Sequence, residues 1–298
     1  MWVLLTLCSA FCLGIYDVLR KYVLRYNAVL PILLCSTLTS SIFMAVILIL
    51  SKAGIIPMDS YYFVPSIPLY MHTMLVVKAA IVLSSWICVY YALKNLPLSI
   101  VSPIRSTAPM WTLIGALIIY SERLNLWQWS GFFVVMAAFM LFAIEGKKEG
   151  IRFVANIWVW LVLIGTLIGS ASALFDKYLV RELNIPRMAI LTYYSFYEVI
   201  LLIPLLLIIW FPHRKENPWV WMWAAPFIGI VIVLAGLFYY GAIQCSDSLI
   251  SLISPIRRSN VLVSFTFAAF LFKEKNILRK AICLAGILLG VALIAVGS

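Results

Sequence analysis

Charged residues are scarce in this sequence. They make up only 11% of the 298 residues, whereas they make up about a quarter of an ordinary soluble domain. Hydrophobic residues account for 65%, and a soluble fold of this length has no interior that could bury so much apolar surface. The composition therefore excludes an ordinary soluble protein and predicts that most of the chain lies in lipid.

Several chemical motifs are absent as well. The six cysteines lie singly within apolar runs and form no CxxC pair, so we expect neither a disulfide framework nor a zinc site. Without a His-Glu-x-x-His motif, paired aspartates or a serine or cysteine beside an available base, we do not expect an enzyme, and no cofactor is implied. The net charge is +11, but basic residues at the ends of apolar runs are typical of membrane proteins. We therefore expect no nucleic-acid partner.

Long apolar runs alternate with short polar linkers along the whole chain. A membrane-spanning helix needs about 20 apolar residues, and runs this continuous differ from the alternating strands of a membrane β-barrel. A helix also satisfies its own backbone hydrogen bonds, as hydrocarbon requires. We therefore predict an all-α integral membrane protein with ten transmembrane helices. The predicted spans are residues 2–19, 31–50, 72–93, 98–120, 127–144, 157–175, 189–211, 219–243, 249–272 and 281–297.

The two halves of the sequence resemble each other. Ser-Pro-Ile-Arg occurs at 102–105 and again at 254–257, each time preceded by a double tyrosine. An acidic residue follows at the same interval in both halves, Glu122 in the first and Glu274 in the second. Two copies of a five-span unit enter the membrane from opposite sides, which is the inverted symmetry of many secondary transporters. The predicted five-helix repeats are residues 1–149 and 150–298.

With these motifs the chain resembles the EamA family of the drug/metabolite transporter superfamily. The resemblance rests on Pro-Ile-Arg in each half, on the stretch from Pro109 to Ser-Glu-Arg at 121–123, and on Lys-Glu-Lys at 273–275. It implies ten helices in two repeats and the transport of amino acids, other metabolites, nucleotide sugars or drugs. Val261 stands where the second repeat would carry the counterpart of Pro109, so symmetric proline kinks are not implied.

Four basic residues lie inside predicted spans: Lys78, Arg105, Arg257 and Arg258. A charge at the bilayer centre costs at least about 2.5–3.5 kcal/mol, so such residues usually face a cavity in the bundle. Alternatively, their long side chains reach the membrane surface by snorkelling. Arg105 and Arg257 hold equivalent places in the repeats, and a guanidinium grips a carboxylate or phosphate with two hydrogen bonds. They predict a site for an anionic or zwitterionic substrate, with Asn260 one turn beyond Arg257.

Further polar residues belong to the candidate site. Glu198 lies mid-span, where desolvation favours the neutral carboxyl group unless a cation is near. We expect it to couple transport to protons or to pair with one of the arginines. Tyr91 and Tyr240, one from each double tyrosine, are expected to line the cavity, because helix neighbours point about 100° apart and at most one of each pair faces it. Asp17 and Asp247 are expected to be solvated at span ends.

These features together predict a secondary transporter of the plasma membrane, the inner membrane in a bacterium. It would move a small anionic or zwitterionic, amino-acid-like metabolite by alternating access, with the lipid bilayer as its surroundings and protons as the candidate coupling ion. Glu122 and Glu274 are expected to act as gates at the membrane surface, or else as helix caps or loop partners. The alternatives are a flippase for a lipid-linked anionic substrate and a drug exporter.

Two lines of inference disagree on the orientation of the chain. Lysine and arginine are more numerous in the loops on the side opposite the termini, so the positive-inside rule predicts that both termini lie outside. The family resemblance implies that both lie in the cytoplasm. Orientation is therefore left open, as are the direction of transport and the oligomeric state.

Overall fold

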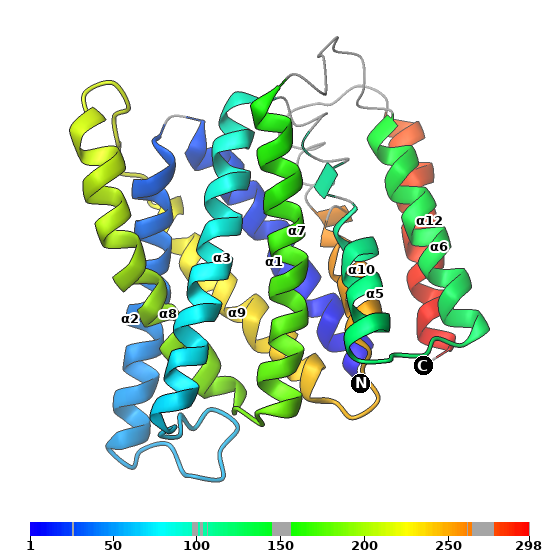
Figure 1. The fold of residues 1–298 in the computed structure, drawn as a ribbon, viewed down its shortest axis with the longest axis horizontal. Coiled ribbons are helices and arrows are strands. Elements are labelled where there is room, and N and C mark those ends of the chain that lie inside the picture. The colour runs from blue at the N-terminus through cyan, green and yellow to red at the C-terminus, as the bar shows by residue number, and fades with distance from the viewer. Residues whose placement is uncertain are drawn as a thin grey trace.

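The computed structural model describes residues 1–25, 27–96, 101, 104–105, 107–144, 156–260, 262–263 and 277–297. These residues form ten α-helices and no β-strand (Figure 1). The helices are α1 (Trp2–Leu24), α2 (Val29–Lys52), α3 (Leu69–Asn95), α5 (Ala108–Ile119), α6 (Leu126–Ile144), α7 (Ile157–Lys177), α8 (Arg187–Leu205), α9 (Ala224–Gln244), α10 (Ile250–Arg257) and α12 (Ile277–Val296). Helical turns η1 (Tyr178–Glu182), η2 (Leu206–Trp210) and η3 (Phe211–His213) extend α7 and α8.

Within the part of the chain that the structure describes, six helices are long and apolar enough to cross a membrane: α1, α2, α3, α7 with η1, α8 with its extensions, and α9. The predicted spans 98–120, 127–144, 249–272 and 281–297 contain the shorter helices α5, α6, α10 and α12. Parts of the first and third of these spans lie outside the described residues. The prediction of a helical membrane protein is confirmed, and six of its ten spans are found as membrane-length helices.

Prolines mark the starts of several helices. Pro68 and Pro186 are the N-caps of α3 and α8, and Pro109 lies in the first turn of α5. A first turn has backbone N–H groups without partners in the helix, so the missing N–H of proline costs little there. Pro204 lies inside α8, and directly after it the chain loosens into the wider turn η2, as expected where a proline removes a helical hydrogen bond.

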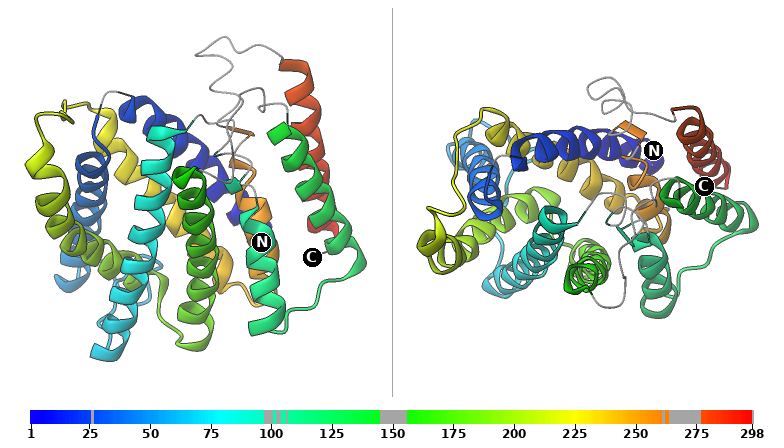
Figure 2. Two further views of the ribbon diagram at one scale, coloured as in Figure 1. Left: turned by 45° about the horizontal axis from the view of Figure 1, so that its top comes forward. Right: turned by 90° about the horizontal axis from the view of Figure 1, so that it is seen from above.

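Helices from the two halves of the chain pack against each other in the centre of the molecule. α1 lies along α9, α3 lies along α7, and α2 contacts both α8 and α9 (Figures 1 and 2). α5 and α10 pack together, with α7 beside α5 and α1 beside α10. Any cavity among these helices is therefore lined by both halves of the chain.

α6 and α12 form a pair at one edge of the bundle (Figure 2). Their contact depends on two glycines. A Cβ atom on Gly131 would lie 2.7 Å from the backbone oxygen of Gly290, and one on Gly290 would lie 2.8 Å from the oxygen of Gly131. Only residues without a side chain let two helix backbones approach so closely in a membrane, where packing contacts hold helices together.

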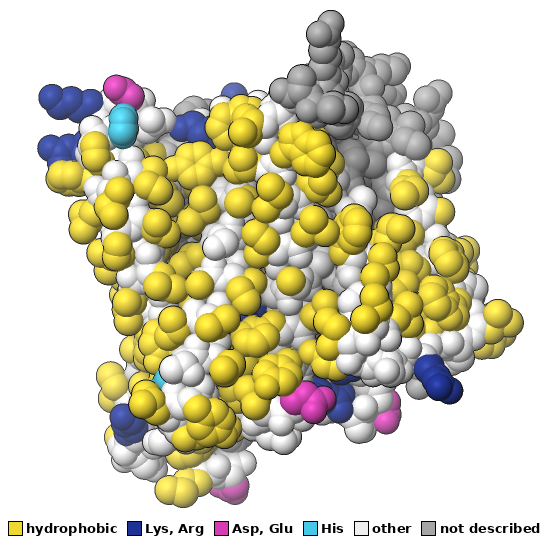
Figure 3. Space-filling model, in the orientation of Figure 1, with side chains coloured by type: hydrophobic (Ala, Val, Ile, Leu, Met, Phe, Trp, Pro, Cys, Tyr) yellow, Lys and Arg dark blue, Asp and Glu magenta, His cyan; other side chains and the backbone are white. Residues whose placement is uncertain are grey.

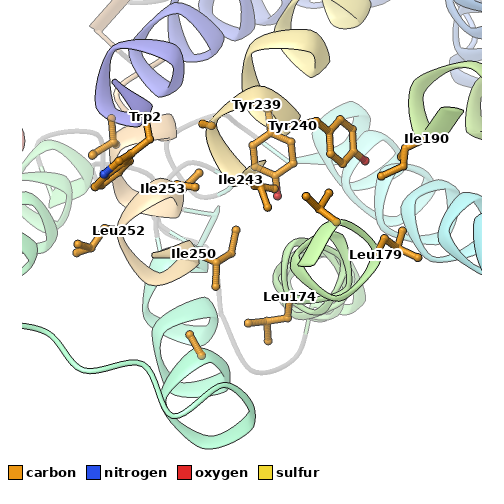
Figure 4. Close-up of a cluster of buried hydrophobic side chains, with 14 of the residues drawn as sticks. Trp2, Leu174, Leu179, Ile190, Tyr239, Tyr240, Ile243, Ile250, Leu252 and Ile253 are labelled. Carbon is orange, nitrogen blue, oxygen red and sulfur yellow. The ribbon is translucent and has the colours of Figure 1, made fainter. Parts of the chain in front are cut away.

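The outer surface is suited to lipid. Figure 3 shows a mostly hydrophobic face, with charged side chains gathered towards its upper and lower ends. Both chain ends lie at the same end of the bundle (Figure 1). At that end a cluster of buried side chains joins Leu174 of α7 and Leu179 of η1 to Ile243 of α9 and Ile250 of α10 (Figure 4). Buried apolar side chains thus hold the ends of these helices together.

Candidate functional site

A cavity of about 260 Å³ lies among the central helices. Helices α1, α2, α3, α5, α7, α8, α9 and α10 all contribute to its wall. Its charged lining residues are Asp17, Arg20, Lys78, Arg105, Asp176, Glu198, Arg257 and Arg258. Basic side chains outnumber acidic ones in this group, five to three. Charges are costly in the membrane interior, so their convergence on one cavity marks it as the candidate functional site.

The structure brings nearly all of the predicted site residues to this cavity. Those lining it are Lys78, Arg105, Glu198, Tyr240, Arg257, Arg258 and Asn260. Tyr91 is the exception, because the preceding residue, Tyr90, faces the cavity instead. Tyr91 lies half-buried beside a separate small hollow with Lys94 and Trp210. Tyr91 therefore does not line this cavity, because helix geometry limits the pair to about one inward tyrosine without indicating which one.

In the second tyrosine pair, both residues face the cavity, although at most one was expected to do so. Both Tyr239 and Tyr240 line the cavity and both donate hydrogen bonds to Asp176, a buried residue of α7 that the sequence did not single out. Tyr240 donates to Oδ1 at 2.8 Å and Tyr239 to Oδ2 at 3.1 Å. One carboxylate on a facing helix can thus satisfy two neighbouring tyrosines.

Lys78 completes this cluster around Asp176. Its ammonium group lies 2.7 Å from Oδ1 of Asp176 and donates to the Ser172 hydroxyl at 2.5 Å. The residue is only 3% exposed, so Lys78 does not snorkel to the membrane surface. Breaking a buried pair of this kind leaves an uncompensated charge, so Lys78 of α3 and Asp176 of α7 each depend on the other.

A second polar cluster lies on α1. Arg20 is buried and forms an ion pair of 2.7 Å with Asp17, while Asn260 donates to the other oxygen of Asp17 at 2.6 Å. The Arg20 guanidinium lies 5.2 and 4.9 Å from the ring centres of Tyr16 and Tyr90. The expectation that Asp17 is solvated at a span end was therefore wrong, because α1 continues to Leu24 and carries Asp17 into the cavity wall. Asp247, by contrast, is exposed as expected.

The three arginines near the proline motifs differ from Arg20 in their partners. Arg257 donates to the Ser9 hydroxyl at 3.2 Å, and its guanidinium lies 3.9 Å from the ring centre of Tyr239. Within the described residues, no carboxylate forms a salt bridge with Arg105, Arg257 or Arg258. All three are half-buried at the cavity. They give the cavity positive charge that the described acidic residues do not neutralise by direct pairing.

Glu198 lies in the cavity wall and is buried. The Tyr194 hydroxyl, one helical turn earlier, donates to its Oε1. Among the described residues, no cation pairs with Glu198 within salt-bridge distance, so the predicted pairing with an arginine is not found there. No three His, Cys, Asp or Glu side chains in the described ranges are placed to hold a metal ion.

Glu122 joins three helix ends below the cavity. Its carboxylate accepts hydrogen bonds from the backbone N–H groups of Ile250 at 2.9 Å and Ser251 at 3.2 Å, and from the Ser251 hydroxyl. Lys177, at the end of α7, lies 2.7 Å from the same carboxylate. A carboxylate at the N-terminus of α10 satisfies free N–H groups and complements the helix dipole. Glu122 is thus a helix cap, which was one of the two roles expected for it. Glu274 lies outside the described residues.

The comparison with known proteins now decides the family. The sequence model of the EamA-like transporter family matches residues 1–144 and 156–296. The chain belongs to the EamA-like transporter family. It is therefore a multi-pass membrane transporter of the drug/metabolite transporter superfamily, whose members are transporters rather than enzymes.

The structural comparison agrees on the fold of this EamA-like transporter. A solved crystal structure matches it with a TM-score of 0.73, covering 99% of this chain and 96% of the other at 15% identity. In all, 28 chains of solved structures match. At that identity the likeness concerns the fold alone. No curated protein sequence matches the chain significantly.

The sequence carried a signal for two residues of the EamA-like transporter that were missed. Lys21-Tyr22 in the first half corresponds to Lys177-Tyr178 in the second. The residues just before these motifs are Arg20 and Asp176, which both line the cavity. Equivalent positions on the first helix of each repeat thus carry opposite charges at one cavity. Both residues lie one position ahead of the repeated Lys-Tyr pair.

Proposed function

We propose that this EamA-like transporter moves a small anionic or zwitterionic, amino-acid-like metabolite across the plasma membrane. The observation that carries the proposal is the set of arginines at the cavity, Arg105, Arg257 and Arg258, without carboxylate partners among the described residues. Guanidinium groups bind carboxylates through paired hydrogen bonds, and a partly desolvated site strengthens that attraction. A ligand with a negative group would compensate the positive charge of these arginines, which is costly to leave unpaired in a membrane.

Alternating access is the proposed transport mechanism. It is supported by the wall of the cavity, which comes from both halves of the chain, and by the packing of α1 on α9 and α3 on α7. In inverted-repeat transporters the halves rock about a central site. Glu122, Lys177 and α10 would hold one end closed in the state described here. Glu198, buried without a cation partner within the described residues, is the proposed proton-coupling residue.

Ligand-induced thermal stabilisation tests the substrate class. Purified protein is heated with amino acids, organic acids, sugar phosphates and cationic drugs in turn. A ligand that binds only the native state stabilises it by about 2.7 kcal/mol at a hundred times its Kd. We expect carboxylate-bearing metabolites to stabilise the parent protein. Arg105→Ala and Arg257→Ala should lose this response.

Arg123→Ala is the matched control, because Arg123 is exposed and lies outside the cavity. It should respond like the parent protein. If only cationic or neutral compounds stabilise the parent, or if both cavity variants respond as the parent does, the arginines do not bind substrate and the proposed substrate class is wrong.

A further inference from the structure

The surroundings of Asp176 form a complete set of donors for one carboxylate. Lys78 and Tyr240 both reach Oδ1, at 2.7 and 2.8 Å, and Tyr239 reaches Oδ2 at 3.1 Å. Figure 4 shows both tyrosine rings projecting from α9 beside the end of α7. One ammonium group and two hydroxyls thus converge from α3 and α9 on two oxygen atoms. Donors placed in this way would suit any carboxylate, whether from the chain or from a ligand.

Two of these donors, Lys78 and Tyr239, have contacts of their own besides Asp176, and the Tyr240 ring packs against the Tyr239 ring at 5.2 Å. Ser172 binds the Lys78 ammonium group through its hydroxyl at 2.5 Å and its carbonyl oxygen at 3.3 Å. The Arg257 guanidinium stacks on the Tyr239 ring at 3.9 Å. Every one of these residues lines the central cavity. A small ligand in the cavity therefore meets donors that are already oriented, and such preorganisation favours binding.

We infer that Lys78, Tyr239 and Tyr240 are a carboxylate-binding subsite of the cavity, which Asp176 occupies in the empty transporter and a substrate carboxylate takes over during binding. This inference rests on the proposed function, because it concerns how the same cavity holds the anionic group. Asp176 acts as an internal competitor. It keeps the Lys78 charge compensated while no substrate is bound, and it lowers the apparent affinity for the incoming carboxylate.

In this scheme the displaced aspartate would turn towards Arg257. The Arg257 guanidinium stacks on the tyrosine that Asp176 contacts, and it has no salt-bridge partner among the described residues. A rotation of the Asp176 side chain towards this guanidinium exchanges one cation for another, so its charge is not left uncompensated. The substrate then gains Lys78 and both tyrosines. Arg257 in this scheme attracts the incoming ligand first, and it holds Asp176 away from the subsite once the substrate carboxylate lies on Lys78 and the tyrosines.

Chemical rescue tests the inference directly. In Asp176→Ala the donors remain and the competitor is gone. Formate or acetate should raise the melting temperature of this variant at concentrations lower than the parent requires, by about tenfold or more. Asp176→Asn fills the space with a neutral amide and should respond between the two. If Asp176→Ala does not fold, the rescue by formate or acetate is measured on Asp176→Asn instead.

Two controls define the outcome. Lys78→Met/Asp176→Ala lacks the central donor and should show no rescue, and Asp247→Ala, which removes an exposed acid, should behave like the parent protein. Inorganic phosphate at the same ionic strength is the comparison ligand. If formate and acetate stabilise the Asp176 variants no more than they stabilise the parent, or if phosphate rescues better than either, the carboxylate subsite is refuted.

This result is separable from the test of substrate class. Rescue of Asp176→Ala by formate, with no stabilisation of the parent by any anionic metabolite, would leave the donor site standing and remove the proposed substrate. Stabilisation of the parent by an anionic metabolite, without rescue of the variant, would keep the substrate class and place its carboxylate away from Lys78.

Discussion

Lys78→Met is expected to lower the free energy of unfolding by about 3–5 kcal/mol, the usual cost of removing one partner from a buried ion pair. The reason lies in Asp176, which is 4% exposed and would keep only its two tyrosine donors. A carboxylate left without its cation in a poorly solvated cavity is destabilised. Reversible unfolding in mixed micelles, followed by circular dichroism, measures the change.

The double variant Lys78→Met/Asp176→Leu should recover most of this loss, because replacing both partners of a buried pair by apolar side chains is often close to neutral. Lys94→Ala is the matched control on the same helix. Lys94 is exposed and binds Asn217, so its replacement should change stability by no more than about 0.5 kcal/mol. Equal small losses for Lys78→Met and Lys94→Ala would mean that the buried pair contributes nothing to the fold.

Glu122→Ala is expected to lower the free energy of unfolding by about 3 kcal/mol. It removes the cap of α10, worth about 1 kcal/mol, and leaves Lys177 without its carboxylate partner. Glu122→Gln, which keeps one side-chain oxygen as an acceptor, should lose less. The same unfolding assay ranks the variants.

Glu122 is also expected to keep one end of the cavity closed. It joins the segment after α5 to the end of α7 and the start of α10, below the cavity. In Glu122→Ala a cysteine introduced at Ser254, which lines the cavity, should react faster with a membrane-impermeant maleimide applied from the side of the chain termini. Glu182→Ala removes an exposed acid of η1 and is the control. Unchanged stability and labelling in Glu122→Ala would show that this carboxylate closes nothing.

The sequence predicted the membrane-length helices well because each is a long apolar run with a clear end. Two helices run well past their predicted ends. The span predicted over 157–175 continues through η1 to Glu182, and α1 was predicted to stop at residue 19 but continues to Leu24. The polar residues Asp17, Arg20 and Lys21 resemble a loop in a hydropathy pattern. They stay helical because Arg20 pairs with Asp17 and stacks between two tyrosines inside the bundle. Tertiary contacts outweighed the local pattern there.

Site residues in a repeated motif could be predicted from the sequence. Site residues whose role depends on which way a helix faces could not. Arg105 and Arg257 stood out because Pro-Ile-Arg occurs twice, and both line the cavity. The inward position of Tyr90 in place of Tyr91 depends on the rotation of α3, whose cavity face carries only the scattered polar residues Lys78 and Ser85 more than one turn before the tyrosines. Asp176 was hidden beside Lys177, since an acidic and a basic neighbour at a span end resemble a solvated pair.

Counterflow in proteoliposomes tests most directly the claim that this cavity carries an anionic metabolite. Vesicles containing the purified transporter are preloaded with the carboxylate-bearing compound that best stabilises it, and they then receive a trace of the labelled compound outside. We expect the parent and Arg123→Ala to accumulate the label transiently, and Arg257→Ala to accumulate none above empty vesicles. If Arg257→Ala exchanges the compound as fast as the parent, or if the parent exchanges only cations or neutral compounds, the arginine-lined cavity is not the path of an anionic substrate.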